Sequence, residues 1–357
     1  MELRDYQKEC IKALPDSGSV MVQMATGLGK TATFSQIPRH GRTLILSHRE
    51  ELVEQPRKYY TCSFGIERAG FYSNREEVVS ASVQTLVRRL ERFAPDEFDL
   101  IITDECHHAA SKTYRTIYDY FRPRLHVGFT ATPNRSDEIR LDDIYSDIVF
   151  QRDLRWGIEH GWLSPIRCLR VNIQYDLSDV ATRMGDYSPK DLAKAMDKSE
   201  CHNAIAQAYE KYAKGATIIF ASSVHCCEEI AKRISGAVVV IGETKNRSKI
   251  IQAFTRREIP CIVNCMVFTE GTDIPLVETV IMARPTQSDS LYTQMVGRGL
   301  RLAQGKKELL LIDCVGVSST RDLCCAPTLL GIDPPDGNKT PWENEIAEDL
   351  FDLPDMI

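Results

Sequence analysis

The feature that most limits the fold is a regular alternation of short apolar runs with longer segments of helical periodicity. Apolar runs occupy residues 20–24, 43–47, 100–103 and 125–129 in the first half of the chain, and 217–221, 237–241, 261–264, 279–282 and 309–313 in the second. Helical candidates between the first runs cover 30–36, 49–60 and 111–121. Continuous apolar runs separated by helices are typical of parallel strands covered on both faces. We therefore predict an α/β protein of two tandem domains.

The boundaries of the predicted domains follow from shifts in composition. We predict a first domain over 1–150, a linker over 151–165, which mixes Gly, Pro and two of the three Trp, and a second domain over 166–325. Residues 177–213 are interpreted as a helical insertion ahead of the second sheet. They could supply a strand-separating wedge, but packing is the favoured role. Residues 326–357 form an acidic, Pro-containing tail.

Charge does not exclude a nucleic-acid partner. The 357 residues carry a net charge of −6, and 43% hydrophobic with 26% charged residues excludes a disordered, collagen-like or disulfide-scaffold chain. Residues 333–357 hold eight acidic side chains against one lysine, so the rest of the chain is close to neutral and can carry a basic groove. We expect the tail to be a disordered, solubilising terminus. The alternatives are a short acidic helix near 342–351, a docking site for a basic protein partner, or a mimic of a nucleic-acid strand.

Cysteine usage and hydropathy indicate an intracellular protein. Twelve cysteines are scattered, and many lie inside apolar runs, where they act as small hydrophobes in a reducing cytosol. The apolar stretches fall far short of the roughly 20 residues that a membrane span requires, and the charged start lacks a signal-peptide core. We expect a soluble cytoplasmic protein, in a bacterium or a phage-infected host, with no membrane partner.

The strongest local signal is a phosphate-binding loop. Ala-Thr-Gly-Leu-Gly-Lys-Thr at 25–31 directly follows the apolar run 20–24. Glycines let backbone N–H groups face phosphate oxygens at a helix start, Lys30 reaches the β- and γ-phosphates, and Thr31 offers a hydroxyl to Mg²⁺. Met24 stands where the strict pattern has its first glycine, so the loop needs support from a second motif.

A pair of carboxylates supplies that support. Asp104 and Glu105 directly follow the apolar run 100–103. A carboxylate at a strand end beside a phosphate loop is where Mg²⁺ is held, and the next carboxylate can polarise the attacking water. The alternative is a capped turn at a helix start, which does not account for the placement after a strand. Together the two motifs predict an ATPase with ATP and Mg²⁺ as cofactors.

A third signal lies in the second predicted domain. Gln294, Arg298 and Arg301 belong to the segment Gln-Met-Val-Gly-Arg-Gly-Leu-Arg at 294–301. On a helix the two arginines share one face, and arginine suits the charge that develops during phosphoryl transfer. A solvated basic helix end is the alternative. An arginine supplied by the second domain would make hydrolysis depend on closure of the domains.

Eight motifs in order, preceded by an adenine-reading segment, resemble those of superfamily 2 helicases. The segments are 3–7 (adenine), 25–31 (motif I), 46–52 (Ia), 82–86 (Ib), 104–107 (a variant of the DEAH box), 130–133 (III), 219–222 (IV), 269–275 (V) and 294–301 (VI). Cys106 replaces the usual Ala of the box, and Thr130 stands where Ser is frequent. The stretches 161–165 and 291–303 most resemble RadD-type and phage-encoded DNA helicases, and are also similar to the XPB-like and restriction-motor branches.

The resemblance implies two RecA-like domains, with ATP in the cleft between them and a single nucleic-acid strand across the top. It assigns nucleotide contacts to Arg4, Tyr6, Gln7, Thr26, Gly27, Gly29, Lys30, Thr31, Asp104, Gly271 and Asp273, with Thr31 and Asp104 also binding Mg²⁺. It makes Glu105 the general base, Gln294 a positioner of water or phosphate, and Arg298 and Arg301 arginine fingers. Residues that would link the domains are His107, Thr130 and Thr132, and residues that would contact nucleic acid are His48, Arg49, Gln84, Thr85 and Ser222.

The predicted function is that of a nucleic-acid-dependent ATPase. It would couple Mg-ATP hydrolysis to translocation on, or unwinding and remodelling of, single-stranded or forked DNA. Outside 177–213 the sequence offers no strand-separating wedge, so it supports hydrolysis and translocation more directly than unwinding. The alternatives are an RNA helicase and a nucleotide-switched binding module without unwinding. Lys30, Glu105 and both arginines argue against the binding module.

Overall fold

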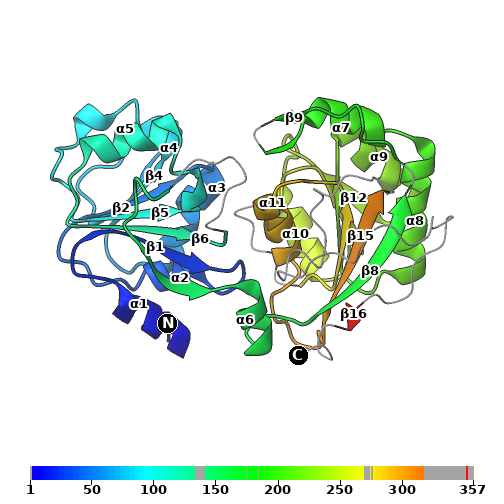
Figure 1. Ribbon diagram of the computed structural model, residues 1–357, viewed down its shortest axis with the longest axis horizontal. Helices are drawn as coiled ribbons and strands as arrows, with labels where there is room; N and C mark the ends of the chain where they lie inside the picture. Colours follow the sequence, from blue (N-terminus) through cyan, green and yellow to red (C-terminus); the bar gives the residue numbers. More distant parts are fainter. Residues whose placement is uncertain are drawn as a thin grey trace. The chain divides into compact units, whose positions relative to one another are not determined.

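Two compact α/β units make up the chain. The computed structural model describes residues 2–132, 141–173, 175–183, 185–268, 274, 276–316 and 351–352. The units are Met1–Asp153 and Leu154–Ile357. Each holds a parallel sheet flanked by helices, so the prediction of a two-part α/β fold is confirmed (Figure 1). None of the described helices is long and apolar enough to cross a membrane.

The described strands of the first unit form one parallel sheet in the order β3-β4-β2-β5-β6-β1-β7. Their bounds are β1 Gly18–Met24, β2 Thr43–Ser47, β3 Phe64–Glu67, β4 Val78–Ser82, β5 Leu100–Asp104, β6 Leu125–Thr130 and β7 Ile148–Arg152. The predicted runs 43–47 and 100–103 match β2 and β5 closely because both strands are buried throughout. β3, β4 and β7 were not predicted because polar residues interrupt their apolar runs, as Ser80 does in β4.

Helices cover both faces of this sheet (Figure 1). They are α1 Asp5–Ala13, α2 Lys30–Phe34, α3 Glu50–Glu54, α4 Val83–Leu86 and α5 Lys112–Tyr120, with 3-10 turns at Gln55–Tyr59, Leu90–Arg92 and Cys106–His108. Leu86 of α4 and Ile117 of α5 pack with Leu44 of β2 in one apolar cluster. The prediction of a single helix over 49–60 is wrong. α3 ends at Glu54 and a 3-10 turn follows, because Pro56 lacks the N–H that a continuing α-helix requires.

The main sheet of the second unit has its described strands in the order β12-β13-β11-β14-β15-β8-β16, and all of its pairs are parallel except β8 with β16. The bounds are β8 Ile166–Ile173, β11 Thr217–Ala221, β12 Ala237–Val240, β13 Cys261–Asn264, β14 Thr279–Ala283, β15 Leu309–Gly316 and β16 Phe351–Asp352, and the helices α6 Leu154–Glu159, α9 Val224–Arg233, α10 Arg247–Thr255 and α11 Asp289–Gly297. β8 was not predicted because polar residues, two of them arginines, break up its apolar sequence. The acidic helix predicted near 342–351 falls outside the described residues except at Phe351.

The insertion predicted at 177–213 lies between β8 and β11, within the second sheet's sequence rather than ahead of it. It contains β9 Thr182–Arg183, β10 Asp186–Tyr187, α7 Pro189–Met196 and α8 Ser199–Tyr212. Leu192 and Ile205 are fully buried in a cluster with Ile219 of β11. Arg284 Nη2 donates to Asp186 Oδ2 at 2.8 Å, which anchors the small hairpin beside the end of β14. Both helices therefore pack on the sheet of their own unit.

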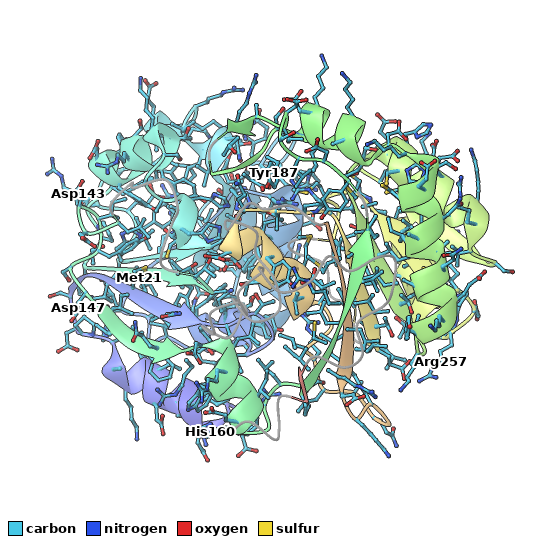
Figure 2. The ribbon with its side chains drawn as sticks, turned by 45° about the vertical axis from the view of Figure 1, so that its right-hand side comes forward. Met21, Asp143, Asp147, His160, Tyr187 and Arg257 are labelled. Atoms are coloured by element: carbon cyan, nitrogen blue, oxygen red, sulfur yellow. The ribbon has the colours of Figure 1, made fainter. Side chains whose placement is uncertain are left out.

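Side-chain burial agrees with this layered arrangement. Met21 and Tyr187 are buried, whereas Asp143 and Arg257 project from surface loops (Figure 2). The ten described cysteines are free, and eight of them are buried. In the described ranges no group of three His, Cys, Asp or Glu side chains is arranged to hold a metal ion by itself.

A buried imidazole lies in the middle of the first sheet. His126 of β6 is 7% exposed, with Nδ1 3.1 Å from Ser19 Oγ and Nε2 3.0 Å from Thr103 Oγ1. Burial lowers the pKa of His126 to about 3. The imidazole therefore stays neutral in the folded chain under acidic conditions that protonate it in the unfolded chain.

This difference predicts a specific acid sensitivity. Below about pH 6.5 the unfolded chain binds a proton at His126 that the folded chain does not bind, so the free energy of unfolding falls as the pH falls. We expect His126 to contribute a loss of up to about 1.4 kcal/mol per pH unit between about pH 6 and pH 3. Urea unfolding followed by circular dichroism measures this loss, and His126→Gln should show a shallower acid dependence. Equal dependences in the two proteins would contradict the prediction.

Candidate nucleotide site and nucleic-acid contacts

The phosphate loop connects the carboxyl end of β1 to α2. Lys30 is the first residue of α2, and residues 25–29 form the turn before it. Gly27 and Gly29 have φ values of 93° and 86°, in the left-handed region where a Cβ is strained. A Cβ at Gly29 would also lie 2.8 Å from Gln7 Nε2. The backbone path of the loop therefore favours glycine at both positions, and at Gly29 a side chain would also displace the end of the Gln7 side chain.

The predicted adenine-reading segment contacts this loop. Tyr6 Oη and Gln7 Nε2 both donate to the carbonyl oxygen of Leu28, at 2.7 and 3.1 Å. Arg4 Nη1 donates to Tyr6 Oη at 3.1 Å, and Arg4 N donates to Gln7 Oε1 at 3.0 Å. Tyr6 and Gln7 are both buried. The segment thus fixes the loop from outside, a role that the sequence did not reveal, and contact with adenine stays a prediction.

Asp104 and Glu105 lie where β5 ends. Lys30 Nζ pairs with Glu105 Oε1 at 3.0 Å, and Glu105 N donates to Asp104 Oδ1 at 3.1 Å. Both carboxylates are buried. Burial first, and the neighbouring charge of Glu105 second, raise the pKa of Asp104. Two buried carboxylates with one lysine suit a hard cation, so the oxygen donors of Asp104 and Thr31 fit Mg²⁺.

β6 brings a threonine to the same edge of the sheet, because β5 and β6 are parallel neighbours. His107 Nδ1 lies 3.1 Å from Thr130 Oγ1 and 3.5 Å from Glu105 Oε2. Thr132 N donates to Thr130 Oγ1 at 3.2 Å. The structure therefore brings together His107, Thr130 and Thr132 beside the predicted base, all within the first unit. Their role in coupling stays a prediction.

Predicted nucleic-acid contacts form a second group at the ends of β2 and β4. Gln84 Nε2 donates to the carbonyl oxygen of His48 at 2.9 Å. The ring centroid of His48 lies 4.2 Å from that of His108, which lies 4.1 Å from that of His107. His108 was missed in the sequence, where its one signal is the doubled histidine of Asp-Glu-Cys-His-His. Arg49 precedes α3 and Thr85 lies in α4, and both are partly exposed.

In the second unit, Gln294 is buried in α11 and Arg298 caps the helix. Arg298 and Arg301 do not share a helical face, because α11 ends at Gly297 and the condition of a helix through both arginines is not met. Just beyond the helix, Gly299 packs so closely against Leu309 that a Cβ at Gly299 would overlap that side chain.

The two stretches that carry the finer family resemblance contact each other. Ser164 Oγ donates to the carbonyl oxygen of Arg301 at 3.2 Å, and Ser164 N donates to that of Leu300 at 2.8 Å.

Three further predicted site residues belong to the second unit. Ser222 follows β11 and is buried. Gly271 and Asp273 lie outside the described residues.

Comparisons with known proteins show to which family the chain belongs. Residues 1–135 match the family described as type III restriction enzyme, res subunit, and residues 200–303 match the helicase conserved C-terminal domain. A Saccharomyces cerevisiae protein named as an ATP-dependent helicase, IRC3, is 35% identical over 92% of this chain and 54% of its own length. The chain belongs to the superfamily 2 helicases.

Other relatives are similar to this chain over most of its length. A 51.5 kDa Lactococcus phage protein is 32% identical over 83% of this chain and 65% of its own, in keeping with the predicted phage-like character. The DNA 3'-5' translocase XPB2 of Sulfurisphaera tokodaii is 25% identical over 88% of this chain and 82% of its own. A solved fragment named as an HsdR subunit of a Vibrio vulnificus type I restriction enzyme has a TM-score of 0.70 at 24% identity, covering 92% of this chain and 67% of that one.

These comparisons fit the tandem RecA-like fold that the resemblance implies, while the RadD-type likeness stays a prediction. The chain spans 54% and 61% of the lengths of the two yeast relatives named IRC3.

The geometry of the phosphate loop predicts that adding one methyl group at Gly29 lowers the affinity for Mg-ATP. Gly29→Ala should weaken Mg-ATP binding by about tenfold or more, because the left-handed φ costs an Ala roughly 1–2 kcal/mol and the Cβ displaces Gln7. Titration with a fluorescent ATP analogue measures the affinity. Gly18→Ala is the matched control, since Gly18 also has a left-handed φ, of 108°, but a Cβ there meets no atom within 4 Å. Equal affinities in the two variants would contradict the prediction.

Proposed function

We propose that this chain hydrolyses ATP with Mg²⁺ and couples the hydrolysis to translocation on, or remodelling of, DNA. The observation that carries the proposal is the ion pair between Lys30 and Glu105 beside the buried Asp104. It joins the phosphate loop to the predicted base in one site of the first unit. DNA as the track is supported by the name of the translocase XPB2.

The pairing of Lys30 with Glu105 suggests how a nucleotide would activate the site. Backbone N–H groups of the loop and the Lys30 ammonium would hold the phosphates, which draws Lys30 away from Glu105. Asp104 and the Thr31 hydroxyl would hold Mg²⁺, whose charge offsets that of the phosphates when it is bound. Glu105, released from Lys30, then accepts a proton from the attacking water.

Residues of the second unit would complete the reaction. Gln294 would position water or phosphate, and Arg298 and Arg301 would stabilise the transferred phosphoryl group, an effect of at least about 10³-fold in rate for an arginine finger. Gly271 and Asp273 would sense the ribose and the far side of the nucleotide. Lys306 Nζ donates to the carbonyl oxygen of Arg301 at 3.1 Å and so helps to fix the backbone at Arg301.

The first unit would complete the nucleotide contacts through Arg4, Tyr6, Gln7, Thr26 and Gly27.

Steady-state ATP hydrolysis without polymer, and with single-stranded, forked and duplex DNA or RNA, tests the proposal. We expect a DNA form to stimulate hydrolysis most, with single-stranded or forked DNA bound through His48, Arg49, Gln84, Thr85 and Ser222. Glu105→Gln should bind ATP but lose turnover by on the order of 10²-fold or more, because an amide cannot accept the proton. Glu258→Gln, at an exposed carboxylate, is the control.

Each other outcome points to an alternative. Selective stimulation by RNA would make the chain an RNA helicase. Low activity that is the same without polymer and with every polymer would leave a nucleotide-switched binding module. Normal turnover in Glu105→Gln would remove Glu105 as the base. The partner of the acidic tail and the cytoplasmic location stay predictions.

The stacked histidines connect the predicted strand contacts to the base. His108 lies between His48, whose carbonyl accepts from Gln84, and His107, which contacts Glu105. We therefore propose that His108 positions His107 in response to strand binding, as a coupling residue without contact to the reacting atoms.

His108→Ala should reduce the stimulation of hydrolysis by DNA about fivefold or more, a coupling free energy of about 1 kcal/mol, and should reduce hydrolysis without DNA much less. The ratio of the two rates is the measurement, and His108→Phe, which keeps a ring in the stack, should restore part of it. His160→Ala removes a stacked histidine from Trp156 in the second unit and serves as the control. A proportional loss of both rates would reduce His108 to a structural residue.

A further inference from the structure

Two neighbouring aromatic side chains are exposed in the connection between β3 and β4. Phe71 is 49% exposed and Tyr72 is 62% exposed. The other large hydrophobic side chains exposed in the described ranges are the aliphatic Val224, Met266 and Leu302, which lie apart in the second unit. Most described aromatic residues of the first unit are buried or half-buried, so two adjacent exposed rings need a reason.

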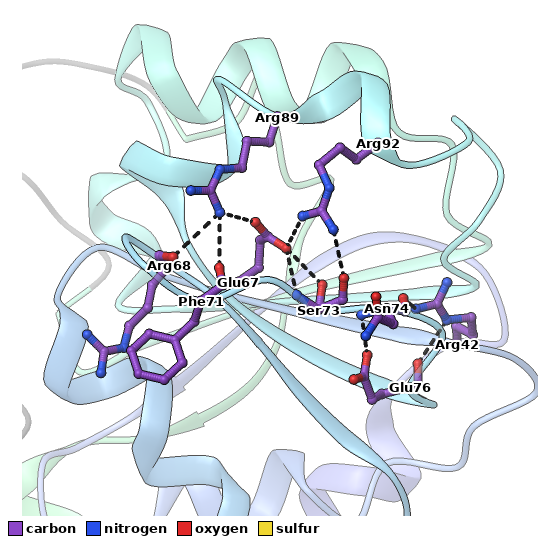
Figure 3. Close-up of polar contacts among 9 residues, drawn as sticks. All are labelled: Arg42, Glu67, Arg68, Phe71, Ser73, Asn74, Glu76, Arg89 and Arg92. Atoms are coloured by element: carbon purple, nitrogen blue, oxygen red, sulfur yellow. Dashed lines mark hydrogen bonds and ion pairs between the residues drawn. The ribbon is translucent and has the colours of Figure 1, made fainter.

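A buried carboxylate fixes the loop that carries the two rings. Glu67, the last residue of β3, is fully buried and pairs with Arg89 at 2.5 Å and with Arg92 at 2.6 Å (Figure 3). Ser73 donates to the same carboxylate through N and Oγ, at 2.9 and 3.0 Å. Burial alone would raise the pKa of Glu67, but the hydrogen bonds from Arg89, Ser73 and Arg92 lower it overall. Both ends of the loop are therefore held to one charged centre.

Arginines also lie against the two rings. The guanidinium carbon of Arg68 is 4.3 Å from the ring centroid of Phe71, and those of Arg89 and Arg92 are 4.0 and 5.0 Å from that of Tyr72. Arg89 Nη1 also donates to the carbonyl oxygen of Phe71 at 3.0 Å. These contacts hold both rings in place while leaving about half or more of each residue open to solvent.

The loop lies at the same edge of the sheet as the predicted strand contacts. Glu67 of β3 pairs with Ala81 of β4 in parallel register, and α4 with Gln84 follows directly. Arg88 N donates to the carbonyl oxygen of Thr85 at 3.1 Å, so the arginine segment 88–92 continues from the end of α4. The exposed rings therefore lie beyond His48 and Gln84 along the same edge of the sheet, next to its outermost strand, β3.

The local charge suits a polyanion. The connection from Glu67 to Glu77 and the segment 88–92 together contain five arginines against four glutamates, in a chain whose net charge is −6. One of the glutamates is the buried Glu67, and Arg75 and Arg88 are exposed. Glu54 pairs with Arg68 at 2.7 Å, so Arg75 and Arg88 are the better candidates for phosphate contacts.

We propose that Phe71 and Tyr72 form a stacking platform for the bases of single-stranded nucleic acid, with Arg75 and Arg88 contacting its phosphates. The proposal rests on the proposed function, because it extends the strand path beyond Gln84. Aromatic rings beside arginines are the chemistry by which proteins bind unpaired bases with little sequence preference. Duplex DNA offers no free base faces in its interior, so the platform selects single strands.

Binding of a fluorescent single-stranded oligonucleotide, followed by anisotropy without ATP, tests the platform. Tyr72→Ala should weaken binding about 5- to 100-fold, the loss of one stacked base, and should weaken duplex binding much less. Tyr72→Trp should retain the affinity, because it keeps a ring. Tyr59→Ala is the matched control, since Tyr59 also has a cation near its ring, Lys58 Nζ at 5.1 Å, but lies outside this loop.

Two results would overturn the platform. Unchanged single-strand affinity in Tyr72→Ala would do so, as would equal losses for single strand and duplex. The proposed function is judged separately, by whether nucleic acid stimulates hydrolysis in the wild type. A stimulated wild type with unaffected Tyr72→Ala binding would retain the function and remove the platform. Binding that depends on Tyr72 without any stimulation would retain the platform and remove the motor.

Discussion

Parallel pairing of β5, β6 and β1 is the constraint on which the nucleotide site depends. The carboxyl ends of parallel strands meet at one edge of a sheet, and β6 pairs with both β5 and β1. Asp104, Thr130 and the phosphate loop therefore lie together although they are far apart in the sequence. The same edge continues through β2, β4 and β3. One sheet edge thus carries the candidate nucleotide site and four of the five predicted strand contacts, and the register of the strands sets their order.

Buried carboxylates paired with cations recur along this edge, but they differ in what can replace the pairing. Glu67 is fully buried and receives two arginines and Ser73, so its charge is satisfied permanently within the protein. Removing both arginines would leave a buried, uncompensated charge, which is strongly destabilising. Glu105 has Lys30, a residue that phosphate oxygens attract in competition. The first arrangement is suited to fix a surface, and the second is suited to change when a nucleotide binds.

The sequence predicted well what depends on short, continuous signals. The apolar runs at β2, β11 and β13 and the loop at Lys30 are each readable from adjacent residues. What it missed depends on pairing between distant segments: β3, β8, the bond from Tyr6 to Leu28, and the stack of His48 on His108. The end of α3 was also missed, because Pro56 interrupts the helical periodicity locally. The end of α11 was missed as well, and the chain beyond it packs at Gly299 against Leu309 of β15. No pattern in the sequence indicates that Tyr72 is exposed, because its exposure follows from the way Glu67 fixes the loop.

A series of contacts in the first unit connects the proposed strand-binding residues to the predicted base, Glu105. Arg89 contacts the Tyr72 ring and the Phe71 carbonyl, and its N–H donates to the carbonyl oxygen of Leu86 in α4. Gln84 of α4 donates to the carbonyl oxygen of His48, and the stacked histidines connect His48 to Glu105. A strand bound along this row can therefore alter the base without any residue of the second unit. Arg298 and Arg301, which we propose to stabilise the phosphoryl group, belong to the second unit, so hydrolysis would require both events. Because both conditions must be met, ATP turnover would remain low until a strand is bound and the second unit presents its arginines.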